Sequence, residues 1–529
     1  MLQPQTLTTT YWTTNFKGTR DDIEYLMARL LEDEMPRTNR ELALALIERR
    51  LQTETERLKQ QLARGSIFQP KNHYEIGQEV IFPALEYALG KVVAVREGNN
   101  PDYGRFSVIE VEFDGQRRRE FASDLQIDHL LNADQSTARE LTVNQPSAEE
   151  IFNQYGDTII EELEARLVDV EDAIFMGGRW YLESLLVKVE VAHLHLAEAA
   201  LDMANGGPLP AEQILDMIGL APEVPLPIRA FSLDVALSQD ERFENVGPDG
   251  SVQWYLRRLA PDEALNVPPR LEYTPVNYDP SVISGELAAI ELELGDEFSD
   301  LPEPAHTPTE ANVFLIYPHR RVGTLPLTKA IEAMLPPASD VARLLLTFVD
   351  GQTDEEFTVW ASREGRYITG VGDFFRRHKL PIGAFISLKK TDHPTRFVID
   401  FKAHRPRSEY IRLAVPNAGR LKFESFKRSI GAVYDEQLIL GAEDIDGVDQ
   451  VWELTRTRRR PLPELILDLL RELAPLMPQH TVHAKTLYSA VNIVRRCPPG
   501  PIFAILLTRP EFEAVGGAYF RVATAEKAY

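Results

Sequence analysis

A short pattern that occurs twice limits the folds available to this chain. Phe243-Glu-Asn-Val-Gly247 and Phe512-Glu-Ala-Val-Gly516 share their aromatic, valine and glycine positions, and each follows a segment with helical spacing. Extended residues resume after each glycine, so both patterns predict a β-hairpin at the end of a group of helices. Three helices and a terminal hairpin form a winged helix, and we expect an internal repeat of about 70 residues.

The two copies resemble the HARE-type winged helix, in which a helical half is followed by a Phe-x-x-Val-Gly hairpin. That family is known from the delta subunit of bacterial RNA polymerase and from chromatin-associated proteins. The resemblance implies a role in transcription or on the chromosome, with RNA polymerase or another nucleic-acid machine as the protein partner. We place the first copy, with a helical region before it, in residues 148–268 and the second copy in residues 461–525.

Helix-start signals predict a further helical domain near the N-terminus. Thr19-Arg-Asp-Asp22 and Thr38-Asn-Arg-Glu41 both fit a capping box, and a third box, Thr53-Glu-Thr-Glu56, would divide the second helix. We predict a helical or winged-helix domain over residues 15–72. The same pattern allows one long amphipathic helix used for dimerisation.

Between residues 73 and 130 the hydrophobic period changes to two, which indicates short strands. A Gly77-Gln-Glu-Val80 opening precedes a Gly90-Lys-Val-Val93 strand, and Asp114-Gly115 supplies a hairpin turn. This order is similar to Tudor/SH3-like barrels, a class that includes the CarD-type domains that contact RNA polymerase. The resemblance implies a second surface for binding protein.

The charge of the chain is unevenly distributed. The 529 residues include 57 Lys+Arg and 81 Asp+Glu, and the net charge of −24 argues by itself against a nucleic-acid partner. Residues 363–428, however, contain 16 basic and 6 acidic residues, a net of +10, so the remainder sums to −24 minus +10, or −34. Residues 271–319 contain ten acidic residues and no Lys or Arg, and we expect an acidic linker over residues 269–311.

The basic window lies in a β-rich region, residues 312–435, and is the strongest chemical signal in the sequence. Its Gly372–Gly383 passage, a helix followed by a strand, resembles that of DNA-binding pseudobarrels. Cations interleaved with aromatic residues can follow a phosphate backbone. The predicted nucleic-acid contacts are Arg363, Arg366, Arg376, Arg377, Lys379, Lys389, Lys390, Arg396, Lys402, Arg405, Arg407, Arg412, Arg458, Arg459 and Arg460. Alternatively, the window docks on the acidic linker or is simply solvated, and the linker can also act as a competing polyanion.

Candidate enzyme sites are weak, and we expect no catalytic residue, metal or cofactor. Asp400-Phe-Lys402 is an acidic-x-Lys pair of the kind that metal-dependent nucleases use, and Asp373 or Asp392 would have to supply the missing carboxylate. Alternation on a basic strand explains the pair more simply. The single cysteine, Cys497, excludes an internal disulfide framework; we interpret it as structural, with its thiol acidified by Arg495 and Arg496.

Together these observations predict an α+β, multi-domain, non-enzymatic protein with repeated winged helices, a small SH3-like barrel and a basic β-rich domain. No signal peptide or membrane span is evident, so we expect a cytoplasmic protein that can associate with the nucleoid. The predicted function is binding of duplex DNA. The apolar helix Ile502–Thr508 cannot read base edges, so winged-helix contacts with DNA would come from Lys485, Arg495, Arg496, Arg509 and Arg521. The alternatives are an RNA polymerase scaffold without DNA affinity and a metal-dependent nuclease.

Overall fold

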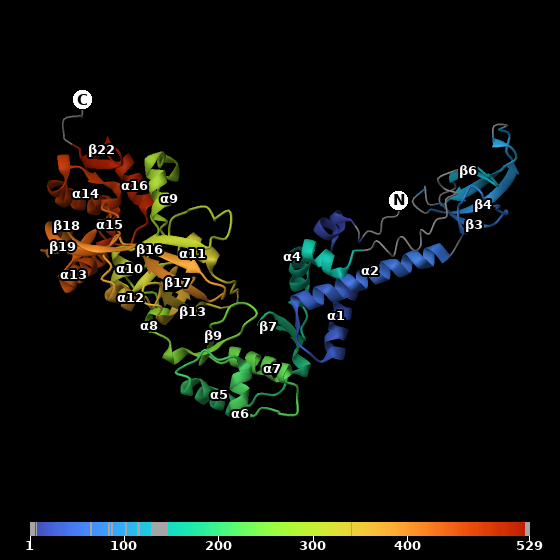
Figure 1. Cartoon of the computed structure of the whole chain (residues 1–529), viewed down its shortest axis with the longest axis horizontal. Helices are drawn as coiled ribbons and strands as arrows, with labels where there is room; N and C mark the ends of the chain where they lie inside the picture. Colours follow the sequence, from blue (N-terminus) through green and yellow to red (C-terminus); the bar gives the residue numbers. More distant parts are fainter. Residues whose placement is uncertain are drawn as a thin grey trace. The chain divides into compact units, whose positions relative to one another are not determined.

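The computed structural model describes residues 6, 8–63, 66–82, 85, 88–100, 103–113, 117–127, 146–339 and 341–523, and its fold class is α+β (Figure 1). The chain forms two compact units, residues 1–188 with 221–232, and residues 189–220 with 233–529. Within the described ranges, every helix is too short or too polar to cross a lipid bilayer.

The first unit contains a winged helix that the sequence interrupts with another sheet. Its elements are α1 (Arg20–Asp33), β1 (Arg37–Thr38), α2 (Asn39–Ala63), α4 (Ala148–Leu167), β7 (Ala173–Met176) and β8 (Arg179–Leu182). The strands pair in the order β1-β8-β7. Leu26, Leu46, Leu163 and Trp180 from these elements share one core. We predicted separate domains at 15–72 and 148–268, but α4 and the hairpin β7–β8 complete the N-terminal winged helix.

The capping boxes explain where these helices begin. Thr19 accepts a hydrogen bond from Asp22 N at the start of α1, while Asp22 accepts one from Thr19 N. The predicted break at Thr53 is wrong, because α2 continues through it and the Thr53 hydroxyl donates to Arg49 O at 2.8 Å. A threonine hydroxyl can donate to a carbonyl of the preceding turn inside a helix. The capping-box motif at Thr53 was therefore not sufficient to predict a helix start.

The inserted sheet lies between α2 and α4 in sequence. Its strands are β2 (Ser66–Ile67), β3 (Glu79–Phe82), β4 (Ala88–Glu97), β5 (Ser107–Phe113) and β6 (Arg117–Ser123), in that order across the sheet. Phe68, Phe82 and Phe121 form its aromatic centre, with ring centroids 4.7 Å and 4.3 Å apart. The predicted turn residues Asp114 and Gly115 lie outside the described residues, but Phe113 and Arg117 on either side pair antiparallel.

The second unit contains the C-terminal copy of the predicted winged helix and all of the middle copy except residues 221–232, which belong to the first unit. The middle copy has α5 (Val191–Met203), α6 (Ala211–Ile218), α7 (Leu226–Ser238), β9 (Phe243–Asn245) and β10 (Trp254–Leu256). The C-terminal copy has α14 (Leu462–Leu473), β21 (Val482–His483), α15 (Ala484–Val494), α16 (Pro499–Thr508), β22 (Phe512–Gly516) and β23 (Tyr519–Val522). Its strand order, β21-β23-β22, matches β1-β8-β7 of the first unit. In the middle copy Leu209 pairs with Trp254 and takes the place of the first strand. The described residues therefore form three winged helices.

A seven-stranded, barrel-like sheet forms the centre of the second unit. Its strands are β11 (Glu310–Phe314), β16 (Phe385–Lys390), β17 (Arg396–Phe401), β13 (Arg343–Asp350), β14 (Glu356–Ser362), β15 (Tyr367–Thr369) and β12 (Thr324–Pro326), in that spatial order. The short helices α8 (Asp262–Leu265), α10 (Tyr317–Val322), α11 (Lys329–Met334) and α12 (Gly372–Arg377) accompany it in the chain. Phe348, Phe374 and Phe397 are buried in its core, so the β-rich prediction for this region is confirmed.

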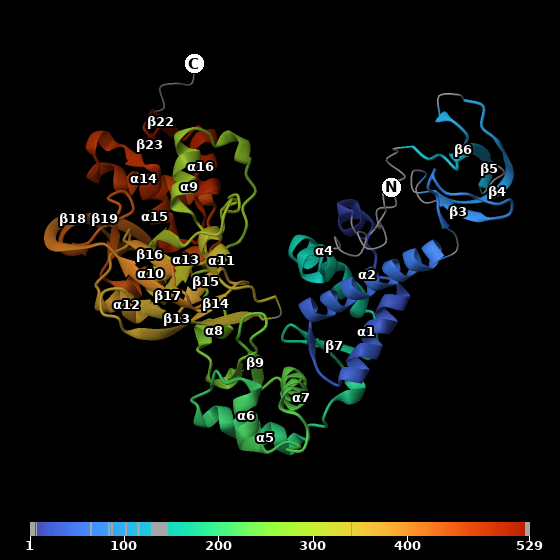
Figure 2. The ribbon, with the colours of Figure 1, turned by 45° about the vertical axis from the view of Figure 1, so that its right-hand side comes forward.

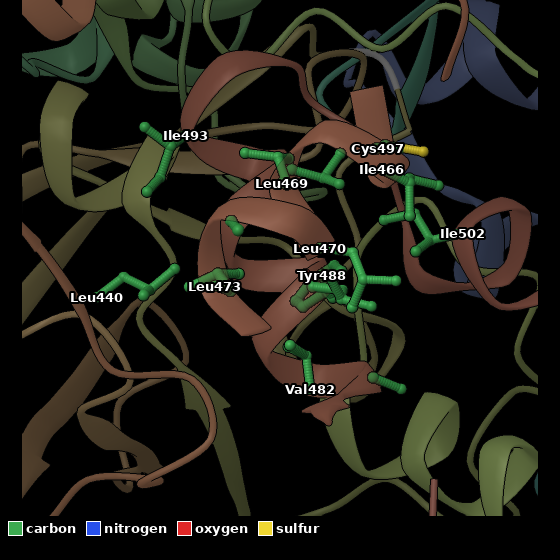
Figure 3. Close-up of a cluster of buried hydrophobic side chains, with 14 of the residues drawn as sticks. Leu440, Ile466, Leu469, Leu470, Leu473, Val482, Tyr488, Ile493, Cys497 and Ile502 are labelled. Atoms are coloured by element: carbon green, nitrogen blue, oxygen red, sulfur yellow. The ribbon is translucent and has the colours of Figure 1, made fainter. Parts of the chain in front are cut away.

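The acidic segment that we predicted as a linker is folded. It contains α9 (Glu286–Leu294), and Leu287, Ile290 and Leu294 are buried in the same core as the C-terminal winged helix. Figure 3 shows part of this core, with Leu470, Tyr488 and Ile502. The three apolar residues of α9 recur at i, i+3 and i+7, which gives the helix one face to bury despite its acidic neighbours.

Candidate nucleic-acid interface

A long two-stranded ribbon carries the most accessible part of the basic window. It consists of β18 (Ala403–Asn417) and β19 (Arg420–Ala432), which pair antiparallel from Arg407–Ile430 to Asn417–Arg420. Figure 2 shows the paired strands at the edge of the second unit. At its base the ribbon follows β17 directly. Near its turn, β20 (Leu440–Ala442) pairs with β18, and α13 (Ile445–Thr457) packs against it.

The ribbon exposes cations that have no acidic partner among the described residues. Arg405 and Arg407 on β18 and Lys422 and Lys427 on β19 are exposed, and no carboxylate of the described residues lies within 4.0 Å of them. Between Ala403 and Ala432 there are seven basic and two acidic residues, a net charge of +5. The ribbon is therefore a locally positive surface on a negative chain.

Two aromatic side chains accompany these cations. Tyr410 is 72% exposed and Phe426 is 45% exposed, which is unusual for rings in a strand with buried neighbours. Tyr410 lies opposite Lys427 in the register, and Lys427 Nζ is 5.8 Å from the centre of the Tyr410 ring. The basic window included Lys422, Lys427 and the interleaved Tyr410, but none of these three, nor Phe426, was among the predicted contacts. The cross-strand register that places Lys427 beside Tyr410 is the signal that was missing.

Five of the other predicted contacts already have acidic partners. The ion pairs are Arg376–Asp373, Arg377–Glu355 at 2.7 Å, Lys389–Glu310 at 3.7 Å, Arg396–Glu356 and Arg460–Asp468 at 2.5 Å. The structure therefore does not bring the predicted set together on one surface. The cations are distributed among the ends of several strands, and acidic residues pair with five of them.

Three of the predicted arginines bind the protein's own backbone. Arg363 donates to Pro336 O at 3.0 Å, Arg366 to Glu297 O at 2.9 Å, and Arg412 to Glu436 O at 2.7 Å. Burial lowers the pKa of Arg412, and its other contact is Thr486. These three guanidinium groups hold loops in place, so we no longer assign them to a nucleic-acid surface.

The remaining predicted cations are exposed and lack a carboxylate partner among the described residues. Lys402 lies at the base of the ribbon, 5.9 Å from the Phe385 ring, and so extends the ribbon surface. Lys379 follows α12, and Lys390 lies at the end of β16 that is remote from Phe385. Arg458 and Arg459 follow the C-terminal end of α13.

The buried carboxylates of the acidic segment form ion pairs with the C-terminal winged helix and not with the ribbon. Asp296 and Glu297 lie 2.6 Å and 2.7 Å from Arg496, whose side chain is only 1% exposed. Glu293 and Asp435 pair with Lys485. Lys485 and Arg496 were predicted as surface contacts of the winged helix, and this prediction is wrong because both are internal ion-pair partners.

The same network includes two further hydrogen-bonding groups. The Tyr488 hydroxyl donates to Asp296 at 2.6 Å; burial and the Asp296 charge raise the pKa of Tyr488 well above its usual value. Burial would raise the pKa of Glu297, but Arg496 and His319 outweigh it and hold that pKa at about 2. The network joins the acidic segment, the barrel-like sheet and α15, and so fixes the C-terminal winged helix in the second unit.

The geometry gives no support to the nuclease alternative. Asp400 accepts a hydrogen bond from Gln352 Nε2 at 2.7 Å, whereas Asp373 is paired with Arg376. Among the residues that the structure describes, no three His, Cys, Asp or Glu side chains gather as metal ligands would. Cys497 is buried, and burial raises the pKa of its thiol to about 12, so the expected acidification by the adjacent arginines is wrong.

The third helix of the C-terminal winged helix is not available to a DNA groove. Ile502, Phe503 and Leu506 of α16 are buried, and α16 packs on α9 and α14. A helix in this position reads bases only when its polar side chains face solvent.

Comparison of the chain with protein-family models, with curated proteins and with solved structures finds no match in any of the three. The resemblances to HARE-type and CarD-type domains accordingly stay predictions.

Proposed function

We propose that this protein is a non-enzymatic, transcription- or chromosome-associated protein that binds duplex DNA through the ribbon β18–β19. The observation that carries the proposal is the group of exposed cations Arg405, Arg407, Lys422 and Lys427, which no acid within the described part of the chain neutralises. A two-stranded ribbon has the width of the major groove of B-DNA, and cations along its edges can meet the phosphates on either side.

The individual side chains suit different parts of a DNA surface. Arg405 and Arg407 can each hold a phosphate oxygen with two parallel hydrogen bonds, while Lys422 and Lys427 act as point charges. Tyr410 and Phe426 supply flat apolar surface for sugars or bases. Because phosphate contacts position a protein without reading sequence, we assign no target sequence to this surface.

The test is fluorescence anisotropy of the full chain with a labelled 20-base-pair duplex over a range of salt concentrations. We expect the triple variant R405Q/R407Q/K427Q to bind more weakly, and the slope of log affinity against log salt to become shallower by about 3, since each phosphate contact contributes roughly 0.9.

The matched control is R376Q/R377Q, which removes two arginines from the same basic window that already have acidic partners. We expect this control to keep most of the wild-type affinity. Absence of binding at 20 mM salt, or an equal loss in both variants, would contradict the proposal.

The second candidate function is a scaffold that binds RNA polymerase without touching DNA. The observation that favours it is the burial of α16, which leaves the C-terminal winged helix without a base-reading helix. The HARE-type and CarD-type resemblances point to the same partner. Pull-down of the polymerase that resists nuclease treatment, by a chain with no affinity for the free duplex, would select this function.

A further inference from the structure

Several arginines converge on a pocket whose lining includes none of the exposed ribbon cations Arg405, Arg407, Lys422 and Lys427. The pocket has a volume of about 540 Å³ and forms where the end of α13 meets the end of α15. Trp452, Arg456, Arg459 and Arg460 line it from the first of these segments, and Arg495 and Arg496 line it from the second. Glu272 is the one acidic residue among the described residues that line it. A concave site with so many guanidinium groups needs a physical explanation, because like charges repel.

The arginines differ in whether their charge is already neutralised. Arg456 pairs with Glu453 at 3.2 Å and Arg460 with Asp468 at 2.5 Å. Arg459 and Arg495, in contrast, have no carboxylate within 4.0 Å in the described part of the chain. Arg495 Nη1 donates one hydrogen bond to Arg460 O at 3.1 Å, and the other N–H groups of this guanidinium can bind a ligand. Two positive charges in the pocket are therefore without an anionic partner.

The helix dipole explains only part of this arrangement. Cations are stabilised near a helix C-terminus, which accounts for Arg456 and for the arginines that follow α13. Arg495, however, comes from the segment after α15 and is brought to the same pocket by the fold. Arg459 also has a backbone φ of +48°, a left-handed conformation that is unfavourable for a non-glycine residue. Neither feature is needed to complement the dipole of α13.

We infer that this pocket binds the terminal phosphate of a nucleotide-sized ligand. Its volume falls within the roughly 300–1,000 Å³ of small-molecule sites, so a duplex cannot enter it, whereas one nucleotide can. A phosphomonoester carries up to two negative charges and matches two guanidinium groups, here Arg459 and Arg495. Trp452 also lines the pocket, and the Arg456 guanidinium lies 5.2 Å from the centre of its ring. This site goes beyond the proposed ribbon surface, because it uses none of Arg405, Arg407, Lys422 or Lys427.

The phosphate can belong to a free mononucleotide or to the 5′ end of a DNA strand, and calorimetry distinguishes these sources. The full chain is titrated with 5′-dAMP, with deoxyadenosine, and with a short oligonucleotide that carries either a 5′-phosphate or a 5′-hydroxyl. We expect 5′-dAMP, the phosphorylated oligonucleotide or both to bind about ten- to hundred-fold more tightly than the matched ligand without phosphate. Preference for the oligonucleotide alone would assign the pocket to strand ends.

The variants R459Q and R495Q should each remove most of this preference. R509Q, which changes an exposed arginine outside the pocket, should keep it. Arg459 is exposed, so R459Q tests the inference even if R495Q disturbs folding. The ribbon variant R405Q/R407Q/K427Q should also keep the preference, which separates this test from that of the proposed function. Equal binding with and without the phosphate, or an equal preference in R459Q and R509Q, would overturn the inference.

Discussion

Two groups of cations in the second unit differ in what faces them. Arg496 and Lys485 are buried, and each lies against two carboxylates, in both cases including one from the acidic segment. Arg405 and Arg407 on the ribbon are exposed and, within the described residues, lack a carboxylate neighbour. The difference shows that availability depends on residues far away in sequence, since Asp296 is 200 positions from Arg496. Local charge density in a sequence measures how much charge is present, not how much is free.

The largest expected effect comes from breaking the buried group. R496M would leave Asp296 and Glu297 buried beside an apolar side chain, and removal of one partner from a buried ion pair costs about 3–5 kcal/mol. We expect the free energy of unfolding of the second unit to fall by that amount. It is measured by urea denaturation followed by circular dichroism.

The matched control for R496M is R509M, because Arg509 is exposed and has no ion-pair partner among the described residues. Its stability should stay within about 0.5 kcal/mol of wild type. If the two variants unfold together, the buried network does not stabilise the C-terminal winged helix and the contrast between the two groups fails.

The next effect is acid sensitivity of the same network. The folded-state pKa of Glu297 is lowered to about 2 from an ordinary 4.5, so its contribution to stability is complete above pH 4.5 and is lost as the pH falls towards 2. We expect the stability difference between wild type and E297Q, measured by urea unfolding at several pH values, to shrink between pH 4.5 and 2. A constant difference over that range would show that Glu297 does not bind Arg496 as a carboxylate.

Local signals predicted the fold where the elements of a domain are consecutive in sequence. The pattern Phe512-Glu-Ala-Val-Gly516 lies directly after its helices, and the C-terminal winged helix was correctly predicted. The N-terminal copy was divided wrongly because the five-stranded sheet separates α2 from α4. Its wing also lacks the Phe-x-x-Val-Gly pattern and has only Gly177-Gly178 at the turn. The pairing of β1 with β8 is what identifies it, and pairing over that distance leaves no local pattern.

The candidate site was predicted in part, and the reason is again long-range pairing. The basic window led to Arg405 and Arg407, which have no carboxylate partner in the part of the chain that the structure describes, but equally to Arg396, whose partner Glu356 is 40 positions away. Alternation along a strand indicates which side chains share a face, and it cannot show what another strand places opposite them. The arginine-lined pocket forms only when the C-terminal end of α13 lies beside the C-terminal end of α15. The sequence does not show this proximity, so Arg495 was expected only at the edge of a winged helix.

A smaller effect is expected for the aromatic part of the ribbon. Y410A removes a ring that is 72% exposed and therefore has little role in folding. A ring that packs on a nucleotide contributes about 1–3 kcal/mol, and we expect the lower end, a rise in Kd of about five-fold for the duplex measured by anisotropy. Y103A, which removes another exposed tyrosine, is the control and should bind as wild type does. Equal affinities of Y410A and wild type would place the DNA away from this part of the ribbon.

The smallest expected effect comes from converting a paired cation of the ribbon into an unpaired one. This tests the contrast between paired and unpaired cations in the opposite direction. Arg428 lies on β19 and pairs with Glu443, and both side chains are about half exposed. E443Q should leave stability within about 1 kcal/mol of wild type, since exposed pairs contribute little.

The freed Arg428 should raise duplex affinity about two- to five-fold at low salt and steepen the salt slope by about 0.9, the contribution of one phosphate contact. E513Q frees Arg521 on the hairpin β22–β23 in the same way and should change neither quantity. A gain in E443Q alone would mean that pairing, and not the number of basic residues, decides which part of this chain meets DNA. An equal gain in both variants would instead indicate that net charge acts without a defined surface.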